Sequence, residues 1–521
     1  MKRFLLSALL AATAPLAAPG APGGRVAGSK HDLSVGGPGP IRAVSEDRVC
    51  IFCHVSHGSG GEVLVNRPDP SAVHVPYESS SLRGRARTPT GATRICLSCH
   101  DGTIALGQTR TGRIEMGAAA PGGRLPPGSP SNLGTDLRST HPVSIVPSDP
   151  RRTRRPPPHG EVALDHAGMV QCTSCHDPHD ELATPEGMFL VRPTRGSDLC
   201  LVCHEMPGLA ASSHFSSPAP ARGARDASRS VAEAGCGACH RSHDTDRGGR
   251  LLARSPEEDE DALCLRCHGT GATRADVGRD LSKPWSHAVP ARGTHDAAEG
   301  PDGRRRLPEV SATAPRHAVC ADCHDPHAAN GRASLAPSAG GALEGAWGID
   351  LSGRRVDPAR FQYEVCLKCH GDSANKPQTL RPTPPETARR ALVDVNLRRV
   401  FDPSAPSFHP VAAPGRNPDV PGLLPPWSTA SLVLCTDCHA SDAGPGAGGS
   451  GARGPHGSVY PHILERDYRT ADFTVESPFA YALCYKCHDR ETLFAASPDP
   501  SRRSGFWSAA AGSLHRLHVR D

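Results

Sequence analysis

One short motif, Cys-x-x-Cys-His, occurs ten times along this chain of 521 residues. Its first cysteines are Cys50, Cys96, Cys172, Cys200, Cys236, Cys264, Cys320, Cys366, Cys435 and Cys484. Its second cysteines are Cys53, Cys99, Cys175, Cys203, Cys239, Cys267, Cys323, Cys369, Cys438 and Cys487. On one helical turn, residues i, i+3 and i+4 share a face, so each motif can present two thiols and one imidazole to a single group. The ten copies use all 20 cysteines, which leaves none for disulfide bonds.

The histidine that ends every copy separates the chemistries that a CxxC pair allows. Zinc sites and redox dithiols also use CxxC pairs, but neither requires a histidine after each second cysteine. CxxCH is the attachment signature of haem c, in which both thiols bind the porphyrin covalently and the histidine binds the iron. The sequence therefore predicts ten covalently attached haems c. Their proximal iron ligands are His54, His100, His176, His204, His240, His268, His324, His370, His439 and His488.

The composition argues against an ordinary apolar core. Aromatic residues make up 4% of the chain, and 54 glycines and 52 prolines amount to about a fifth of it. Such a chain has many helix and strand breakers and few large apolar side chains. We therefore predict a mostly irregular chain with short α-helices wrapped around covalently bound haems, little β structure and an elongated multihaem cytochrome architecture. Its folding should depend on haem.

Charge and hydropathy bear on partners and location. The formal net charge is +4, but each haem adds two propionates, so the loaded protein should be acidic and is not expected to bind nucleic acid. Residues 1–18 combine Lys2 and Arg3 with an apolar run, which predicts a secretory signal peptide. No later segment has the length and hydropathy of a transmembrane helix. We expect an exported protein, located in the periplasm or at the cell surface or outside the cell.

The motifs divide the remaining chain into five pairs separated by connectors rich in proline and glycine. The predicted haem pairs span residues 25–116, 131–210, 211–270, 281–375 and 400–490, followed by a C-terminal tail at 491–521.

Eighteen further histidines could bind the opposite faces of the irons, and two repeated contexts select ten of them. In the first context, a histidine lies three residues beyond the proximal one, too close to reach around its own haem but able to reach a neighbour. These are His57, His179, His243 and His327, with His456 in the same role after a Gly-rich insertion in the fifth pair. In the second context, a histidine precedes each pair: His31, His141, His214, His287 and His409.

The other candidate ligands are treated as alternatives or as surface residues. His166 and His317 are plausible substitutes because they lie just upstream of Cys172 and Cys320. The histidines expected at the surface are His74, His159, His295, His462, His515 and His518. The four methionines after the initiator show no common spacing from the motifs and are interpreted as packing residues. Two histidines per iron predict low-potential, six-coordinate haems without a vacant site.

Several strings carry a resemblance to a known family. They are Lys30-His31-Asp-Leu-Ser, Cys50-Ile-Phe-Cys-His-Val-Ser-His57, Cys96-Leu-Ser-Cys-His-Asp-Gly-Thr-Ile, His141-Pro-Val, Cys172-Thr-Ser-Cys-His-Asp-Pro-His179 and Gly-Pro-His456-Gly-Ser. On them the chain resembles the multihaem cytochromes with doubled CxxCH motifs of anaerobic respiratory electron-transfer chains. The resemblance implies bis-histidine haems, packed edge to edge or stacked, that relay electrons through the periplasm or to the cell surface. The chain departs from the pattern in its Gly-rich insertion and in lacking proline before His57 and His243.

The predicted function is electron transfer in anaerobic respiration, towards an extracellular acceptor, and not enzymatic catalysis. The expected partners are other redox proteins, namely cytochromes or an outer-membrane barrel protein. Two alternatives remain. One is a multihaem reductase for nitrite, hydroxylamine or a sulfur oxyanion, which would need one open haem. The other is a structural subunit of a cytochrome filament or of an outer-membrane conduit.

Overall fold

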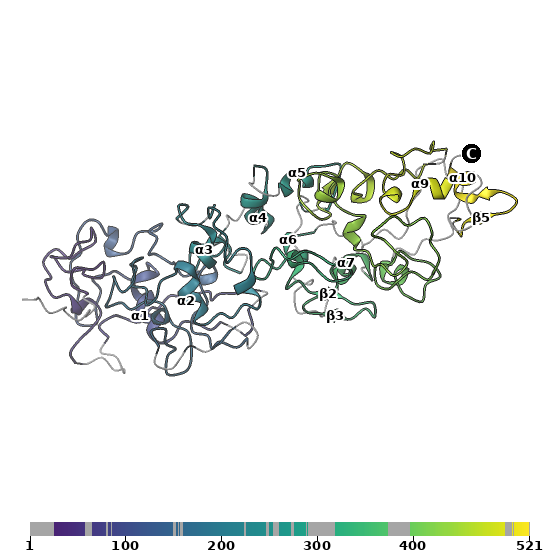
Figure 1. Cartoon of the computed structure of the whole chain (residues 1–521). Coiled ribbons are helices and arrows are strands. Elements are labelled where there is room, and N and C mark those ends of the chain that lie inside the picture. Colours follow the sequence, from purple (N-terminus) through teal and green to yellow (C-terminus); the bar gives the residue numbers. More distant parts are fainter. Residues whose placement is uncertain are drawn as a thin grey trace, which may run out of the picture.

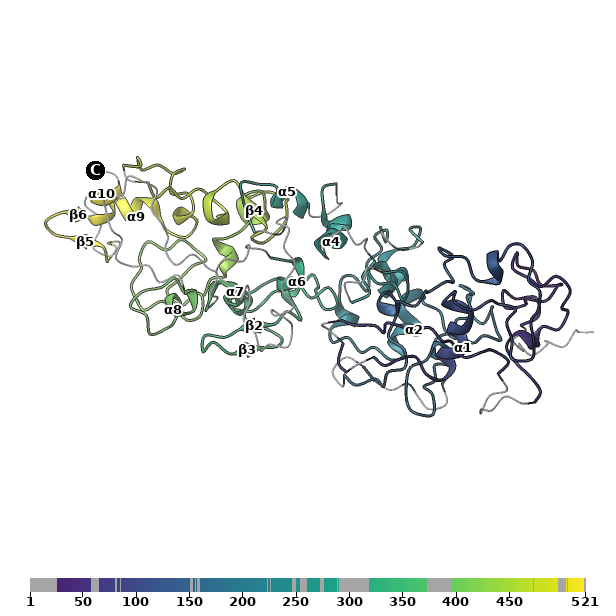
Figure 2. The same ribbon diagram turned by 180° about the vertical axis from the view of Figure 1, so that it is seen from behind.

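The computed structural model describes residues 26–57, 65–79, 82–84, 86–149, 153–154, 156, 160–222, 224, 226–245, 250–253, 260–271, 276–287, 289, 318–372, 396–471, 473–494, 503 and 505–519. The predicted signal peptide at 1–18, and also His159, His295 and His317, lie outside these residues. The molecule is elongated, with the first part of the chain at one end and the C-terminal elements at the other (Figure 1). The reverse view in Figure 2 shows the same order of segments along the long axis.

The helices are short, and the longest one among the described residues has 10 residues. The α-helices are α1 (Gly91–His100), α2 (Asp198–Leu201), α3 (Val231–Ala234), α4 (Glu260–His268), α5 (Val277–Leu281), α6 (Cys320–Cys323), α7 (Gln362–His370), α8 (Leu397–Val400), α9 (Arg490–Phe494) and α10 (Leu514–Val519). Five 3-10 helices begin at or beside a motif: η1 (Cys50–Phe52), η4 (Cys172–Ser174), η7 (Gly235–Ala238), η10 (Cys435–Asp437) and η13 (Cys484–Lys486). The others are η2 (Pro121–Gly123), η3 (Leu137–Ser139), η5 (Arg195–Ser197), η6 (Leu209–Ala211), η9 (Gly341–Leu343), η11 (Pro445–Ala447) and η12 (Pro461–Ile463).

Three antiparallel ribbons of two-residue strands make up the sheet structure in the described part of the chain. They pair β1 (Trp285–Ser286) with β4 (Gly457–Ser458), β2 (Gly348–Ile349) with β3 (Arg355–Val356), and β5 (Trp507–Ser508) with β6 (Gly512–Ser513). The first ribbon joins segments far apart in sequence and brings the approach to the fourth pair beside the fifth. The chain is thus mostly irregular, with few short helices and little sheet, as the composition predicts.

Apolar packing between side chains is local. One cluster of buried residues contains Ala346, Ala359 and Val365, and another contains Tyr363, Leu367 and Val411. Both involve α7 and its neighbours, and neither is large enough to organise the molecule. None of the described helices combines the length and the hydropathy needed to cross a membrane.

Candidate haem sites

Every Cys-x-x-Cys-His motif forms one turn of helix. In three of them the turn is part of a longer helix, namely α1, α4 and α7. In the other seven, the backbone N–H of the histidine donates to the carbonyl of the first cysteine at 2.8–3.0 Å; these histidines are His54, His176, His204, His240, His324, His439 and His488. The two thiols and the imidazole of each motif therefore share one face, which is what attachment to a single porphyrin requires.

Four histidines from upstream of the pairs lie opposite the second proximal histidine of their own pair. The ring centres are 6.0–6.4 Å apart in His31–His100, His141–His204, His214–His268 and His287–His370. The ring planes of these couples cross at 65–83°.

Four histidines that follow the first motif of a pair lie opposite the first proximal histidine of the preceding pair. The ring centres are 6.1–6.4 Å apart in His179–His54, His243–His176, His327–His240 and His456–His324. Here the planes are 13–33° apart. His456 holds the position that His327 holds one pair earlier, on the far side of the Gly-rich insertion.

The spacing of these eight couples fits one iron between two imidazoles. A histidine nitrogen binds a first-row metal at about 2.0 Å and lies about 1.1 Å from its ring centre, so two axial imidazoles place their ring centres about 6.2 Å apart. Direct contact between the rings would bring the centres closer, and independent surface histidines would not repeat one distance eight times. The residues present therefore fit haem iron at these positions.

Hydrogen bonds to Nδ1 turn the proximal rings so that Nε2 faces the partner. In five of them Nδ1 donates to a backbone carbonyl at 2.7–2.9 Å. The donor and acceptor residues are His100 and Ser131, His176 and Met188, His240 and Arg250, His324 and Ala342, and His439 and His462. In the Asp-Pro-His strings the aspartate accepts a hydrogen bond from Nδ1 of the distal histidine two residues later. These bonds join Asp177 to His179 and Asp325 to His327. Such a bond fixes the tautomer and leaves Nε2 for the metal.

Three of the upstream histidines are held by the residue that directly precedes the distal histidine of the following pair. Nδ1 of His31 donates to the carbonyl of Pro178 at 3.2 Å, and His214 and His287 donate in the same way to Pro326 and Pro455 at 3.0 and 2.7 Å. The second pair departs from this pattern because Ser242 replaces the proline.

There, the backbone N–H of His141 donates to the carbonyl of Ser242 at 2.7 Å, and the ring bonds the carbonyl of Pro142 at 3.1 Å. The substitution of proline before His243 therefore changes which group orients the distal ring and leaves the ring couple intact.

Burial lowers the pKa of several candidate ligands and so favours their neutral form. It lowers the pKa of His141 and of His456 to about 4, and it also lowers the pKa of His31, His204 and His240. An imidazole must be unprotonated to bind a metal, so this environment favours ligation at neutral pH.

The thiols connect successive pairs. The first cysteine of a second motif lies close enough to the first cysteine of the next pair to raise or lower its pKa in four couples: Cys96–Cys172, Cys200–Cys236, Cys264–Cys320 and Cys366–Cys435. Because each motif marks the edge of one porphyrin, these contacts place consecutive attachment sites side by side across every junction between pairs.

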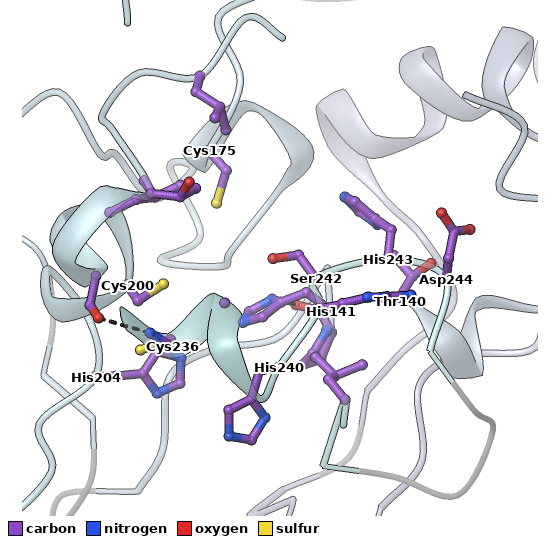
Figure 3. Close-up of a pocket in the computed structure, with 18 of the residues that line it drawn as sticks. Thr140, His141, Cys175, Cys200, His204, Cys236, His240, Ser242, His243 and Asp244 are labelled. Carbon is purple, nitrogen blue, oxygen red and sulfur yellow. Dashed lines mark hydrogen bonds between the residues drawn. The ribbon is translucent and has the colours of Figure 1, made fainter. Parts of the chain in front are cut away.

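A cavity of about 3700 Å³ runs through the first part of the molecule. It is lined by both cysteines and the proximal histidine of each of the first six motifs, and by their distal histidines. Figure 3 shows His141 and His204 in this cavity with Cys200 and Cys236 nearby. Ordinary ligand pockets measure roughly 300–1,000 Å³, so the cavity has room for several large groups and not for one small substrate.

Two proximal histidines lack a couple of this geometry among the described residues. The charges of His409 and His515 lower the pKa of His488 beyond the effect of burial, which places both near it. No described imidazole lies opposite His439. His57 is exposed and faces no proximal ring within the described part of the chain.

The remaining histidines separate into surface and structural residues. His166, His462 and His518 are exposed. His74, expected at the surface, is instead buried, and its Nε2 lies 3.1 Å from a carboxylate oxygen of Asp101. That expectation was wrong because no local pattern distinguishes His74; its burial comes from its contact with the end of α1.

Comparison with known proteins agrees with the assignment of the CxxCH motifs. Residues 166–207 and 229–273 match the protein family described as "Doubled CXXCH motif". No curated protein matches the chain. The motifs and this match support a multihaem c-type cytochrome, with haem c bound covalently at CxxCH motifs. The match lies in the second and third predicted pairs, two of the three pairs whose motifs line the cavity.

Proposed function

We propose that the chain binds ten haems c and conducts electrons along them without transforming a substrate. The observation that carries the proposal is the set of eight imidazole couples with ring centres 6.0–6.4 Å apart. An iron held between two imidazoles has no open position, so it can exchange electrons but cannot bind a substrate.

The haems, when bound, supply one-electron redox chemistry. The chain presents two thiols and a proximal ring to each of them, and in five motifs a backbone carbonyl sets the orientation of that ring. In the eight couples it places a second imidazole opposite the proximal one, and its cross-pair thiol contacts keep neighbouring haem positions adjacent. These arrangements favour low potentials and an unbroken series of sites from Cys50 to Cys487.

The proposed context is anaerobic respiration, with transfer towards an extracellular acceptor. The predicted signal peptide supports export, to the periplasm or the cell surface. Other cytochromes, or an outer-membrane barrel protein, are the proposed partners, because a chain of low-potential sites needs a donor and an acceptor of the same kind. Detection of the protein in fractionated cells and co-purification of redox partners test this part.

Two measurements on the purified protein test the central proposal. A pyridine haemochrome assay should return ten haems per chain, and the reduced haems of the eight couples should bind negligible carbon monoxide. A far lower haem count, or stoichiometric carbon monoxide binding at several irons, would refute it.

The alternative of a reductase for nitrite, hydroxylamine or a sulfur oxyanion has one specific observation in its favour. The face opposite His439 carries no described imidazole, so the iron attached at Cys435 and Cys438 is where such an enzyme would work. Turnover of one of these substrates, abolished when carbon monoxide saturates a single haem, would favour the reductase.

A further inference from the structure

A lysine joins the two motifs of a pair in both the fourth and the fifth pair. Lys368 and Lys486 are the third residues of the second motifs of these pairs. Nζ of Lys368 donates to the backbone carbonyl of Asp322, and Nζ of Lys486 donates to that of Asp437 at 2.6 Å. Asp322 and Asp437 are the third residues of the first motifs. The same link between the same two motif positions is therefore made twice.

An arginine makes an equivalent link in the first pair, although it comes from outside the motifs. Arg67 is buried, and it donates to the carbonyl and the hydroxyl of Ser98 at 2.7 and 3.0 Å. Ser98 is the third residue of the second motif. On the other side, the backbone N–H of the neighbouring Asn66 donates to the carbonyl of Cys53 in the first motif at 2.8 Å. A buried cation thus connects the two motifs here as well.

The third pair has a link of the same kind. Arg266 is the third residue of its second motif and donates to the carbonyl of Ala253 at 2.7 Å. The backbone N–H of Ala253 donates in turn to the carbonyl of Cys239 in the first motif at 2.8 Å. Four of the five pairs therefore hold a positive charge between their motifs. Because one of these four cations lies outside the motifs, the arrangement follows from the fold and not from one sequence string.

The lysines lie beside the second cysteine of each motif of their pair. Burial raises the pKa of the Cys323 and Cys369 thiols, and the positive charge of Lys368 opposes that rise at both. Lys486 opposes in the same way the rise in pKa that burial causes at the two second cysteines of the fifth pair. The second cysteines are attachment points of haem c, so each lysine adjoins the positions of both haems of its pair.

The two lysines differ in the groups that face them. Lys368 is buried, and its ammonium lies 4.7 Å from the centre of the Trp347 ring, which carries no net charge. Nζ of Lys486 instead lies 3.1 Å from a carboxylate oxygen of the buried Glu465. Arg466 also approaches that carboxylate, at 3.6 Å, but its side chain is more exposed, so solvent screens its charge. Glu465 therefore brings a buried negative charge to one lysine, where the other has an indole.

We propose that Lys368 raises the reduction potentials of both haems of the fourth pair, and that Glu465 offsets the same effect of Lys486 in the fifth pair. A nearby positive charge stabilises the reduced haem, which carries one more electron. Because each cation lies between two motifs, it acts on two haems together, whereas an axial ligand acts on one. The proposal rests on the haem binding proposed above and names the side chains that set the potentials of these two pairs.

The first test replaces Lys368 in the haem-loaded full chain. Two unit charges about 10 Å apart, at an effective dielectric constant of about 20, change an equilibrium by roughly tenfold, which is about 59 mV for one electron. In a spectroelectrochemical titration of Lys368→Met, about a fifth of the absorbance change should move to lower potential by this amount. Lys368→Arg keeps the charge and should titrate like the wild type. Arg332→Met is the matched control, because Arg332 carries the same charge in the same pair at an exposed site, paired with Glu344, and it should leave the titration unchanged.

The second test removes the buried carboxylate of the fifth pair. Glu465→Gln should move a different fifth of the absorbance change to higher potential, because the charge of Lys486 is then no longer offset. The double variant Glu465→Gln, Lys486→Met removes one charge of each sign, and its titration should lie close to that of the wild type.

The outcomes separate this proposal from the proposed function. With full haem content, unchanged potentials in Lys368→Met overturn the proposal, and so does a shift confined to a single haem. Equal shifts in Lys368→Met and Lys368→Arg also overturn it, because packing and not charge would then set the potentials. If Lys368→Met fails to load its haems, Glu465→Gln decides, and a titration like that of the wild type refutes the proposal. A haem count far below ten in the wild type would instead refute the proposed function itself.

Discussion

Replacing His141 by methionine should raise the potential of one haem and leave the others nearly unchanged. The backbone of His141 is fixed independently of its ring, because its N–H donates to the carbonyl of Ser242 at 2.7 Å. The new thioether therefore starts from the position that faces His204, 6.1 Å between ring centres in the native couple. Axial ligands tune haem potentials over a range of roughly 0.8 V, and we expect this exchange to contribute on the order of 100 mV upward. At about 59 mV per tenfold for one electron, that is a roughly 50-fold gain in electron affinity.

A spectroelectrochemical titration measures the effect. About a tenth of the absorbance change should move to higher potential, accompanied by the weak far-red band of a thioether bound to ferric iron. His166→Met, at an exposed position without a facing ring, should titrate like the wild type. If His141→Met and the wild type give the same titration curve and spectrum, His141 is no iron ligand and the argument from ring spacing fails.

The other predictions concern the same sites. The ring planes are 13–33° apart in four couples and 65–83° apart in the other four. Electron paramagnetic resonance of the ferric protein should therefore show two classes of low-spin signal, each with the spin of four of these eight haems. One uniform class would contradict this prediction. Burial lowers the pKa of His141 and His456 from 6.5 to about 4. The stability gained by keeping these side chains neutral is therefore complete above pH 6.5 and is lost as the pH falls towards 4. An acid titration of the low-spin absorption bands should show this loss below pH 6.5 and no comparable loss above it. The buried Arg67 donates to the carbonyls of residues 98, 105, 106 and 108 at 2.7–3.2 Å. Arg67→Met should therefore lower the free energy of unfolding by about 3 kcal/mol and lower the urea midpoint. Arg48→Met, at an exposed position, should change neither.

The sequence was sufficient to predict the attachment chemistry, and it also selected two kinds of candidate distal histidine, because both depend on local strings. It also predicted an irregular chain, since glycine and proline limit regular structure wherever they occur. It could not tell which distal histidine faces which iron. That assignment depends on how the pairs stack, and the spacing of His179 from the motifs is the same whether it serves an earlier or a later haem.

Two further features required the structure because they depend on contacts distant in sequence. The proline of the DPH and GPH strings is a conspicuous residue without an evident role in the sequence, yet its carbonyl orients the upstream histidine of the preceding pair, as Pro455 does for His287. His74 is buried against Asp101 across 27 residues, and nothing in its immediate sequence predicts that contact. Local patterns therefore identify ligands, while their partners and supports come from the packing of one pair on the next.

The ligand rule makes the haem pairs interdependent. In a repeat protein whose units touch their neighbours, stability is shared between each unit and the interfaces it forms. Here every internal interface includes an imidazole from the following pair that faces a proximal histidine, so a couple is complete only when the next pair has folded against it. The same junction brings two attachment sites into thiol contact, as at Cys200 and Cys236. The packing that completes one imidazole couple therefore also brings the next attachment site near, and a break in the fold at any junction would also interrupt the proposed electron path there.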